Sequence, residues 1–568
     1  MENAAIDLAI FLDGRDSFGE HTFFETSREI GNMAFSNITR RAIFSLATSS
    51  SIPAALTLAR AAEPASPQAP TRVGLDAILH PRTEAETAAR VVPANYEHPP
   101  GNVLRYGTND APGTTDVSSA FQAAFDQQAH GGAVIYVPTG IYRIDSVVST
   151  ATAAPFALHG DGMGKTVIVA GSDADCFVIS NSISALNQIT ISDLTISPAV
   201  AMSKGSALSL TCTGIIPSVT LRNIMVLCSG TSVFRQGIKL RNCGEVELSR
   251  VFIYGIIGSN SMVGVSVTQS VAATVYKFVG CSIYNVEYGF TFTDETAPGI
   301  EGIQFYGCDI VGVHCGVLYT NAFGSRYFPP QLTWIGGHIN ASVRSFDLSI
   351  MCQVFIKDLL SYNSGNFQHI RLTDVADVSI QGNTFIQIGG TADGITMSAG
   401  GKFHGGIVAA NLFRMGAGGS AVNLDATNLR DLTISDNQRV SGSTTVNVSA
   451  GALDGSILIL DNTPRDTVDI YDATLTGAIS MTLAGIRSDY CYIKAPSRAT
   501  TCSALTSRHA WDRVILDCAS NLLTLTHNAV PDGFFLAGGV DYTFPATGGR
   551  ITLEKRNGGY WTEVARSC

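Results

Sequence analysis

Short stretches in which apolar and polar residues alternate recur along the middle of the chain. Ten of them share one pattern, chiefly β-branched or aromatic residues alternating with polar ones, and begin at Ile189, Val219, Val246, Tyr276, Ile303, Leu332, Val354, Val378, Ile407 and Leu432. The first and last starts lie 243 residues apart, so the nine steps average 27 residues. Such alternation predicts strands. A period of this length predicts a coil of three short strands per turn, since propeller blades need about 40–50 residues.

A helix is predicted before the first of these strands. Ser118 or Ser119 is a suitable N-cap for a helix that continues through Gln128, and Gly131 and Gly132 follow its end. One face of this helix is apolar and consists of Ala120, Phe121, Ala124 and Phe125. A short buried strand is then expected at 134–137, followed by a turn at 138–140.

The region around this helix resembles the opening of the pectate-lyase-like superfamily, including its polygalacturonase-related and tailspike-like members. The matching residues are Tyr106, Gly107, Asp110, Asp116, Ala120, Ala123, Gly131, Gly132, Pro138, Gly140, Tyr142 and the stretch 159–162. The resemblance implies an all-β fold, a right-handed parallel β-helix over residues 102–450. It also implies that the helix covers the open end of the coil, where backbone donors would otherwise be exposed.

The last part of the chain, residues 451–568, loses the period and predicts a C-terminal β-sandwich-like module. Its final hairpin is expected to pair 550–555 with 560–565 across the turn at Asn557. This end resembles the C-terminal β modules of phage tailspikes and related depolymerases, which implies a homotrimer. A terminal sheet that covers the last coil is the alternative.

The beginning of the chain has the features of an export signal, assigned to residues 1–62. Arg40 and Arg41 precede an apolar stretch at 46–58 and a small-x-small site at 59–61, a pattern typical of twin-arginine export. Met33 is an alternative start. Residues 63–101 are rich in Pro and Ala and predict a linker or neck. We therefore expect a secreted or periplasmic protein.

Composition excludes several classes of partner. The net charge of −11 argues against nucleic acid, whose phosphates need a basic surface. No membrane span is expected, because no segment reaches 18 apolar residues. The 12 cysteines are scattered through strand patterns and are expected to be mostly buried free thiols, with a disulfide among Cys491, Cys502 and Cys518 as the exception. No metal or other cofactor is expected.

Aligning neighbouring turns of the predicted coil places three polar residues in one outward slot. Ser282, Asp309 and His338 each follow the same strand and turn pattern and should form a ladder on one face. An Asp beside a His orients the ring and raises its pKa. The pair therefore suits proton transfer to or from a sugar.

Two long loops add candidate residues. The first contains Asp294, Glu295 and Glu301, and any two of these or Asp309 would serve as a glycosidase pair, about 5–5.5 Å apart for retention or about 6.5–9.5 Å for inversion. Calcium at the three loop acids is the alternative. Residues expected to bind substrate are Tyr319, Arg326, Tyr327, Asn340 and Lys357.

These features predict a secreted depolymerase that cleaves glycosidic bonds of a bacterial exopolysaccharide, capsule or cell-wall glycan. Hydrolysis is preferred because carboxylates outnumber well-placed bases. A lyase acting by β-elimination, an epimerase and a non-catalytic glycan-binding adhesin or spike remain alternatives. Plain pectin hydrolysis is disfavoured, since the Asn-Thr-Asp, Asp-Asp and Gly-His-Gly motifs of polygalacturonases are absent.

Overall fold

The computed structural model describes most of the chain from residue 79 onward. Stretches outside the description are 1–78, 182–187, 213–217, 259–261, 272, 296–299, 322–329, 399–402, 426–428, 443–444, 449–456, 461, 464–467, 471–477, 483–485, 488–489, 494–498, 507–512, 529, 557–558 and 568. The predicted export signal therefore lies outside the described residues.

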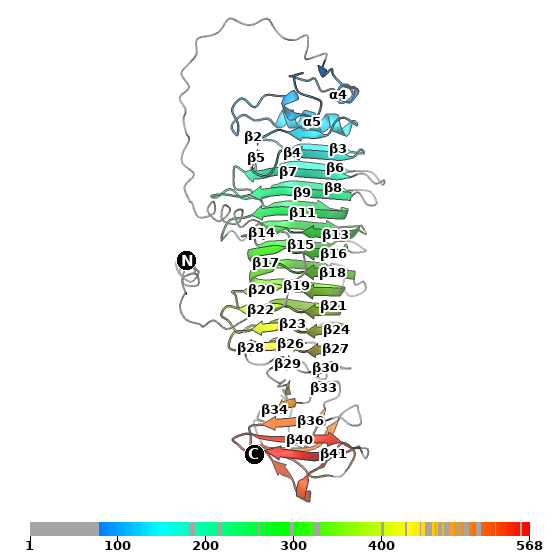
Figure 1. Ribbon diagram of the computed structural model, residues 1–568, viewed down its shortest axis with the longest axis vertical. Helices are drawn as coiled ribbons and strands as arrows, with labels where there is room; N and C mark the ends of the chain where they lie inside the picture. Colours follow the sequence, from blue (N-terminus) through cyan, green and yellow to red (C-terminus); the bar gives the residue numbers. More distant parts are fainter. Residues whose placement is uncertain are drawn as a thin grey trace, which may run out of the picture. The chain divides into compact units, whose positions relative to one another are not determined.

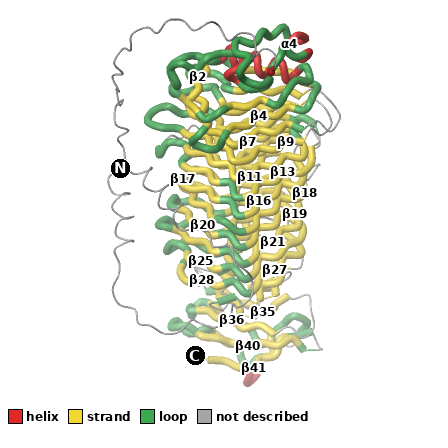
Figure 2. The backbone as a smooth tube through the Cα atoms, turned by 45° about the horizontal axis from the view of Figure 1, so that its top comes forward, coloured by secondary structure: helices red, strands yellow, loops and turns green. Residues whose placement is uncertain are grey.

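Residues 72–568 form one compact unit. Its strands stack as a coil with three faces, and the strands of each face pair in parallel (Figures 1 and 2). The first face consists of β1 (Ile135–Val137), β4 (Phe156–Gly160), β13 (Ala273–Val279), β16 (Ile300–Tyr306), β18 (Pro330–Ile335), β24 (Phe403–Ala409), β27 (Leu429–Ser435), β30 (Ile457–Leu460) and β33 (Ile486–Arg487). The second face consists of β2 (Gly140–Ile144), β5 (Thr166–Ala170), β14 (Ser282–Tyr284), β20 (Leu360–Asn363), β22 (Thr384–Gln387), β25 (Leu412–Arg414) and β28 (Gln438–Ser441). The third face consists of β3 (Val148–Thr152), β6 (Phe177–Asn181), β8 (Ser206–Cys212), β10 (Gln236–Arg241), β12 (Val263–Gln269), β15 (Tyr288–Asp294), β23 (Ile395–Ser398), β26 (Val422–Asp425), β29 (Val446–Val448), β31 (Val468–Ile470), β34 (Tyr490–Ile493) and β36 (Arg513–Cys518).

Six longer strands pass from one face to the next. Three of them, β7 (Ile189–Pro198), β9 (Ser218–Leu227) and β11 (Gly244–Tyr254), join the first face to the second. The others are β17 (Asp309–Asn321), β19 (His338–Lys357) and β21 (Ile370–Gln381). Bends between the first and second faces contain residues with positive φ, such as Gly307 (φ 56°) and Asp358 (φ 55°), and the bend before His338 contains two, Gly336 (φ 69°) and Gly337 (φ 84°). The predicted parallel β-helix is confirmed.

The predicted register holds for nine of the ten repeat positions. Neighbouring members pair directly, as in Ile303 with Leu332 and Leu332 with Val354. Ile407 is the exception, because Gly406 pairs with Val378 instead. A shift of one residue turns a side chain to the opposite face of a strand. Ile407 is therefore exposed, and Val408 is buried.

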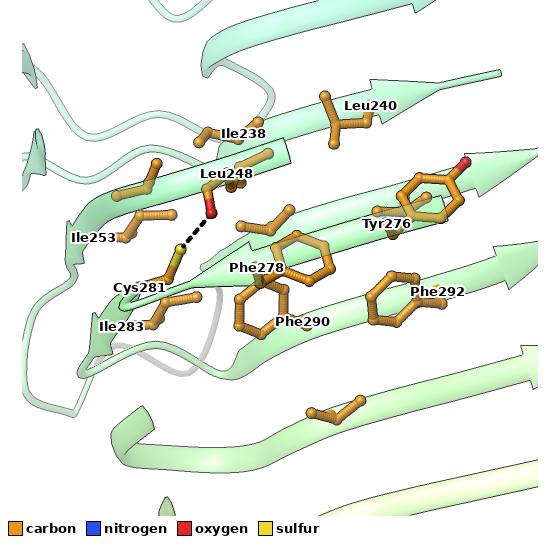
Figure 3. Close-up of a cluster of buried hydrophobic side chains, with 14 of the residues drawn as sticks. Ile238, Leu240, Leu248, Ile253, Tyr276, Phe278, Cys281, Ile283, Phe290 and Phe292 are labelled. Carbon is orange, nitrogen blue, oxygen red and sulfur yellow. Dashed lines mark hydrogen bonds between the residues drawn. The ribbon is translucent and has the colours of Figure 1, made fainter. Parts of the chain in front are cut away.

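The inside of the coil is filled by apolar side chains from all three faces. Figure 3 shows Phe278 from the first face against Phe290 from the third, with ring centroids 4.7 Å apart. Trp334 is fully buried against Phe305, as its inward strand position predicts. Among the described cysteines, Cys518 is a free, buried thiol and Cys502 is buried, whereas the side chain of Cys491 lies outside the described residues. The thiols thus behave as small apolar groups.

A ladder of buried asparagines connects later turns of the coil. Asn383, Asn411, Asn437 and Asn462 stack at the bend between the first and second faces. Each side-chain amide donates to the next carboxamide oxygen at 2.9 Å and to a backbone carbonyl of the turn before. This arrangement satisfies polar groups that would otherwise be costly to bury.

The helix α5 (Ser118–Ala129) covers one end of the coil, where Figure 1 labels it above the first strands. Phe121 and Phe125 pack on Phe177 with ring centroids 5.8 and 5.4 Å away. Ser118 is the first helical residue, and the N-cap position is Val117, which makes no side-chain capping bond. Asp116, just before it, accepts the backbone N–H and the hydroxyl of Ser118. The predicted helix is confirmed, whereas the predicted serine cap is wrong.

Residues 79–101 contain a helix and a buried ion pair, although the sequence suggests a linker there. Helix α4 (Glu84–Ala88) begins with a capping box between Thr83 and Glu86. Glu86 accepts hydrogen bonds from Arg105 Nε at 2.6 Å and from the Tyr106 hydroxyl at 2.9 Å. Both charged side chains are fully buried. This segment is therefore attached to the cap by charged, water-excluded contacts.

The C-terminal region combines continued coil with antiparallel strands. Parallel pairing continues past residue 450, through β34 to β36. A separate four-stranded sheet contains β32 (Ala478–Thr482), β35 (Thr500–Thr506), β37 (Leu523–Leu525) and β39 (Tyr542–Thr543). The last strands are β38 (Phe534–Phe535), β40 (Gly549–Lys555) and β41 (Trp561–Ser567), and β40 and β41 form the predicted hairpin.

One buried histidine makes the stability of the coil sensitive to acid. His369 Nδ1 lies 2.7 Å from the Ser361 hydroxyl, and burial lowers the pKa of His369 to about 3. An unfolded histidine takes up a proton near pH 6.5, whereas the folded one does not, so stability falls as pH drops below about 6.5. We expect a loss of about 2 kcal/mol between pH 6.5 and pH 5. Urea unfolding of the wild type and His369→Gln at both pH values measures this, and an equal drop in the variant would contradict it.

Candidate functional site

The predicted ladder of polar residues is present on the second face. Ser282 pairs with Asp309, and Asp309 pairs with His338, in one register row across β14, β17 and β19. Cys281 and Cys308 are buried immediately before the first two members. The bend at Gly307 ends the first face, and strand alternation then directs the ladder outward.

His338 has an environment that favours a neutral imidazole. Its ring meets the edge of Tyr362 with centroids 5.4 Å apart, and its Nε2 is buried without a hydrogen-bond partner among the described residues. Burial lowers the pKa of His338, and the charge of Asp309 opposes this only in part. We expected the neighbouring aspartate to raise the pKa, and the net direction is the opposite because desolvation is the larger effect. A neutral imidazole is suited to accept a proton.

A row of tyrosines runs beside the ladder, two positions further along each strand. Tyr254, Tyr284, Val311, Asn340 and Tyr362 occupy it in register order. The rings of Tyr254 and Tyr284 stack with centroids 4.9 Å apart and an interplanar angle of 5°. Sequence reasoning missed these tyrosines, although the same alignment of turns, extended by two residues, contains them. Half-buried aromatic side chains of this kind suit contact with sugar rings at their accessible edges and faces.

A pocket of about 180 Å³ lies where the second face bends into the third. Its polar lining includes Asn285, His314, Asn340, Ser342 and Ser364. Gly312 also lines it with φ at 68°, and a Cβ there would come within 2.5 Å of Asn285 Oδ1. Ligand pockets for whole small molecules are about 300–1,000 Å³, so this one suits part of a larger ligand.

The loop acids lie away from this pocket. Asp294 is buried at the end of β15, where it accepts hydrogen bonds from the Tyr319 hydroxyl and, at 2.9 Å, from Ile300 N. Burial raises the pKa of Asp294, although these hydrogen bonds oppose it. Asp294 continues the inward set of Phe290 and Phe292 on its strand. This buried position differs from the expected substrate-facing one.

The other two acids also lie apart from Asp309. Glu295 forms a two-point ion pair with Arg241, at 2.7 and 3.2 Å. Glu301 is near the start of β16, five residues before Tyr306 at its end, which is about 16 Å of strand. Neither a retaining nor an inverting spacing to Asp309 is compatible with that separation. The described loop acids therefore do not form a carboxylate pair with Asp309.

The expected substrate-binding residues fall in different places. Tyr319 is fully buried, because strand alternation places it inside the coil with Val317, and this corrects the expectation that it binds sugar. Asn340 lines the pocket, as expected of a binding residue. Lys357 is exposed at the end of the first face beside Ile335. Arg326 and Tyr327 lie outside the described residues.

Among the described residues, no group of three or more His, Cys, Asp and Glu side chains could hold a metal ion. Within the described part of the chain, no helix has the length and apolar character needed to cross a membrane.

Comparison with known families identifies the first part of the coil. Residues 101–316 match the profile described as "Rhamnogalacturonase A/epimerase, pectate lyase-like". This segment is therefore similar to the pectate-lyase-like family over residues 101–316. It contains the cap, Asp309 and His314, whereas His338 and Asn340 follow it.

The coil has distant likenesses among solved structures. The pre-mature gene product 12 of bacteriophage phi29 is 13% identical at a TM-score of 0.44, covers 72% of this chain, and is itself covered over 65% of its length, just under two thirds. Tailspike protein 3 of bacteriophage CBA120 is 14% identical at a TM-score of 0.43, with coverage of 82% and 69%. The A-module of an Azotobacter vinelandii mannuronan C-5 epimerase is 13% identical at a TM-score of 0.39, with coverage of 64% and 100%. No curated protein sequence matches.

Proposed function

We propose that the protein binds a polysaccharide along the second face and transfers a proton on it at Asp309 and His338. The observation that supports this most directly is the register row in which a carboxylate and a neutral imidazole lie beside stacked tyrosines and a polar pocket. The family description of residues 101–316 names enzymes of polysaccharides, which supports the substrate class.

The geometry favours proton abstraction over two-carboxylate hydrolysis. Hydrolysis needs two carboxyls that reach the substrate. Among the described acids, Asp294 is buried, Glu295 is paired with Arg241, and Glu301 is about 16 Å of strand away from the end of the first face that leads to Asp309. In β-elimination, His338 takes the proton α to a uronate carboxylate. The electron pair forms a carbon–carbon double bond, and the leaving sugar oxygen departs and gains a proton. The neutral state of His338 suits this role.

Binding without cleavage is the second candidate. It is favoured by the burial of His338 Nε2, which a substrate reaches only after side chains around it move, Tyr362 among them. The stacked tyrosines and the shallow pocket would serve this function equally well.

The deciding experiment incubates the full chain with acidic and neutral bacterial polysaccharides. Products are examined by mass spectrometry and by the absorbance of unsaturated uronates. Unsaturated ends support elimination, shorter chains with an added water establish hydrolysis, and binding without any product supports the second candidate. Absence of binding across the whole panel would refute the proposed function.

Tyr284→Ala is expected to weaken polysaccharide binding about fivefold, or about 1 kcal/mol, because it removes half of the stacked pair. Affinity electrophoresis in gels containing the polysaccharide measures this. Tyr136→Ala, on the first face and hydrogen-bonded to Asp161, is the matched control. Equal retardation of the Tyr284 variant and the wild type would exclude the tyrosine row from the binding surface.

A further inference from the structure

Two arginines share one aspartate on the third face, next to the pocket. Arg371 donates to Asp347 through Nε at 2.8 Å and Nη2 at 2.7 Å. Arg344 donates to the same carboxylate through Nη1 at 3.3 Å and lies over the Phe367 ring at 5.5 Å. Asp347 is nearly buried, with 12% of its side chain exposed, so the two guanidinium groups are held in fixed positions.

The cluster of Arg344, Asp347 and Arg371 has one more positive charge than negative charge. One carboxylate balances one guanidinium, so the three side chains together carry a net positive charge on a chain whose total is −11. Arg371 has five N–H donors, of which two bind Asp347. Its side chain is 40% exposed, so its remaining donors are available to a ligand.

Arg344 and Asp347 lie on the same strand, β19, as His338 of the proposed site. His338, Asn340, Ser342 and Arg344 are successive outward positions of β19, while Ile339, Ala341 and Val343 between them are buried. At about 3.3 Å per residue, the path from His338 to Arg344 is about 20 Å of strand. Asn340 and Ser342 line the pocket in between. One continuous track therefore leads from the Asp309–His338 pair, across the pocket, to Arg344.

We propose that Arg344 and Arg371 bind a carboxylate of an acidic glycan, one or more sugars away from the unit at His338. Guanidinium groups bind planar carboxylates through paired N–H donors, and aromatic packing keeps Arg344 in place. This inference rests on the proposed function and adds the charge of the substrate and the residues that select it. The cluster lies on a different face from the acid–base pair and so selects without taking part in proton transfer.

The test uses polysaccharides in matched pairs, each acidic polymer beside its carboxyl-reduced form. Full-length protein and variants are compared by affinity electrophoresis. Arg371→Gln leaves Asp347 paired with Arg344 and changes a partly exposed side chain, so the fold should be kept. Arg371→Lys keeps the charge and removes the two-point geometry. Arg241→Gln, which removes an exposed arginine paired with Glu295, is the control.

We expect carboxyl reduction to weaken binding about tenfold for the wild type and for Arg241→Gln. Arg371→Gln should bind the acidic polymer about tenfold more weakly and the reduced polymer unchanged, and Arg371→Lys should fall between. Equal binding of both polymers by the wild type, or discrimination retained in Arg371→Gln, would overturn this inference while the proposed function stands. If no polymer of either kind binds, the proposed function fails and this inference fails with it.

Discussion

Replacement of His338 by alanine is expected to lower turnover of the polysaccharide by about 10²- to 10⁴-fold, the usual contribution of a general base. Binding should change much less, because the tyrosine row and the pocket stay in place. The measurement is the initial rate of product formation at saturating polysaccharide, alongside affinity in the same buffer. His130→Ala, at the exposed end of α5, is the matched control.

The pH profile separates a proton-transfer role from a structural one. Burial lowers the pKa of His338 and the charge of Asp309 raises it, so Asp309→Asn should move the acid limb of the rate profile to lower pH. A purely structural aspartate would lower the rate without moving that limb. If His338→Ala retains full turnover, this histidine is not the base, and the assignment must move to another residue.

Glu86→Ala is expected to lower the free energy of unfolding of the N-terminal cap by about 3–5 kcal/mol. The variant leaves the Arg105 guanidinium fully buried without its carboxylate, and an uncompensated buried charge has about this cost. The hydroxyl of Tyr106 loses its acceptor as well. Hydrogen exchange of residues 79–106 is the suitable measurement, because it reports local opening of this segment separately from the coil.

Glu247→Ala provides the comparison for that variant. Glu247 and Lys277 form an ion pair at 4.0 Å, and both side chains are almost half exposed. Such surface pairs contribute about 0–1 kcal/mol. If residues 79–106 exchange hydrogen at similar rates in the two variants, the buried Glu86–Arg105 pair does not attach residues 79–101 to the cap.

The coil was predictable because its register is repeated in every turn. Apolar residues at the inward positions define this register. The prediction was wrong only at Ile407, an apolar residue in an outward position beside the inward Val408. The Asp309–His338 ladder followed from the same alignment. The ion pair of the cap could not be predicted from this alignment, because Glu86 and Arg105 lie in two segments that have no repeat and meet only through tertiary packing.

The loop acids show which features of the candidate site could be predicted from strand alternation and which could not. Asp294 and Tyr319 continue the inward sets of their strands, so strict alternation would have placed both inside. The partner of Glu295 could not be foreseen, since Arg241 stands two turns earlier in the coil. The direction of the His338 pKa depended on the packing of Tyr362 and its neighbours, which no local pattern encodes.

The asparagine ladder gives the later part of the coil an adjustable length. Each asparagine side chain bonds to the neighbouring asparagines and to a backbone carbonyl of the turn before, and this pattern is the same in each turn. Removing or duplicating one whole repeat between Asn383 and Asn462 would therefore leave every remaining amide satisfied. Each added repeat would lengthen the stack by about 4.8 Å. Duplication of a repeat would thus change the spacing between the turns of the proposed site and the terminal hairpin, while the residues around His338 stay unchanged.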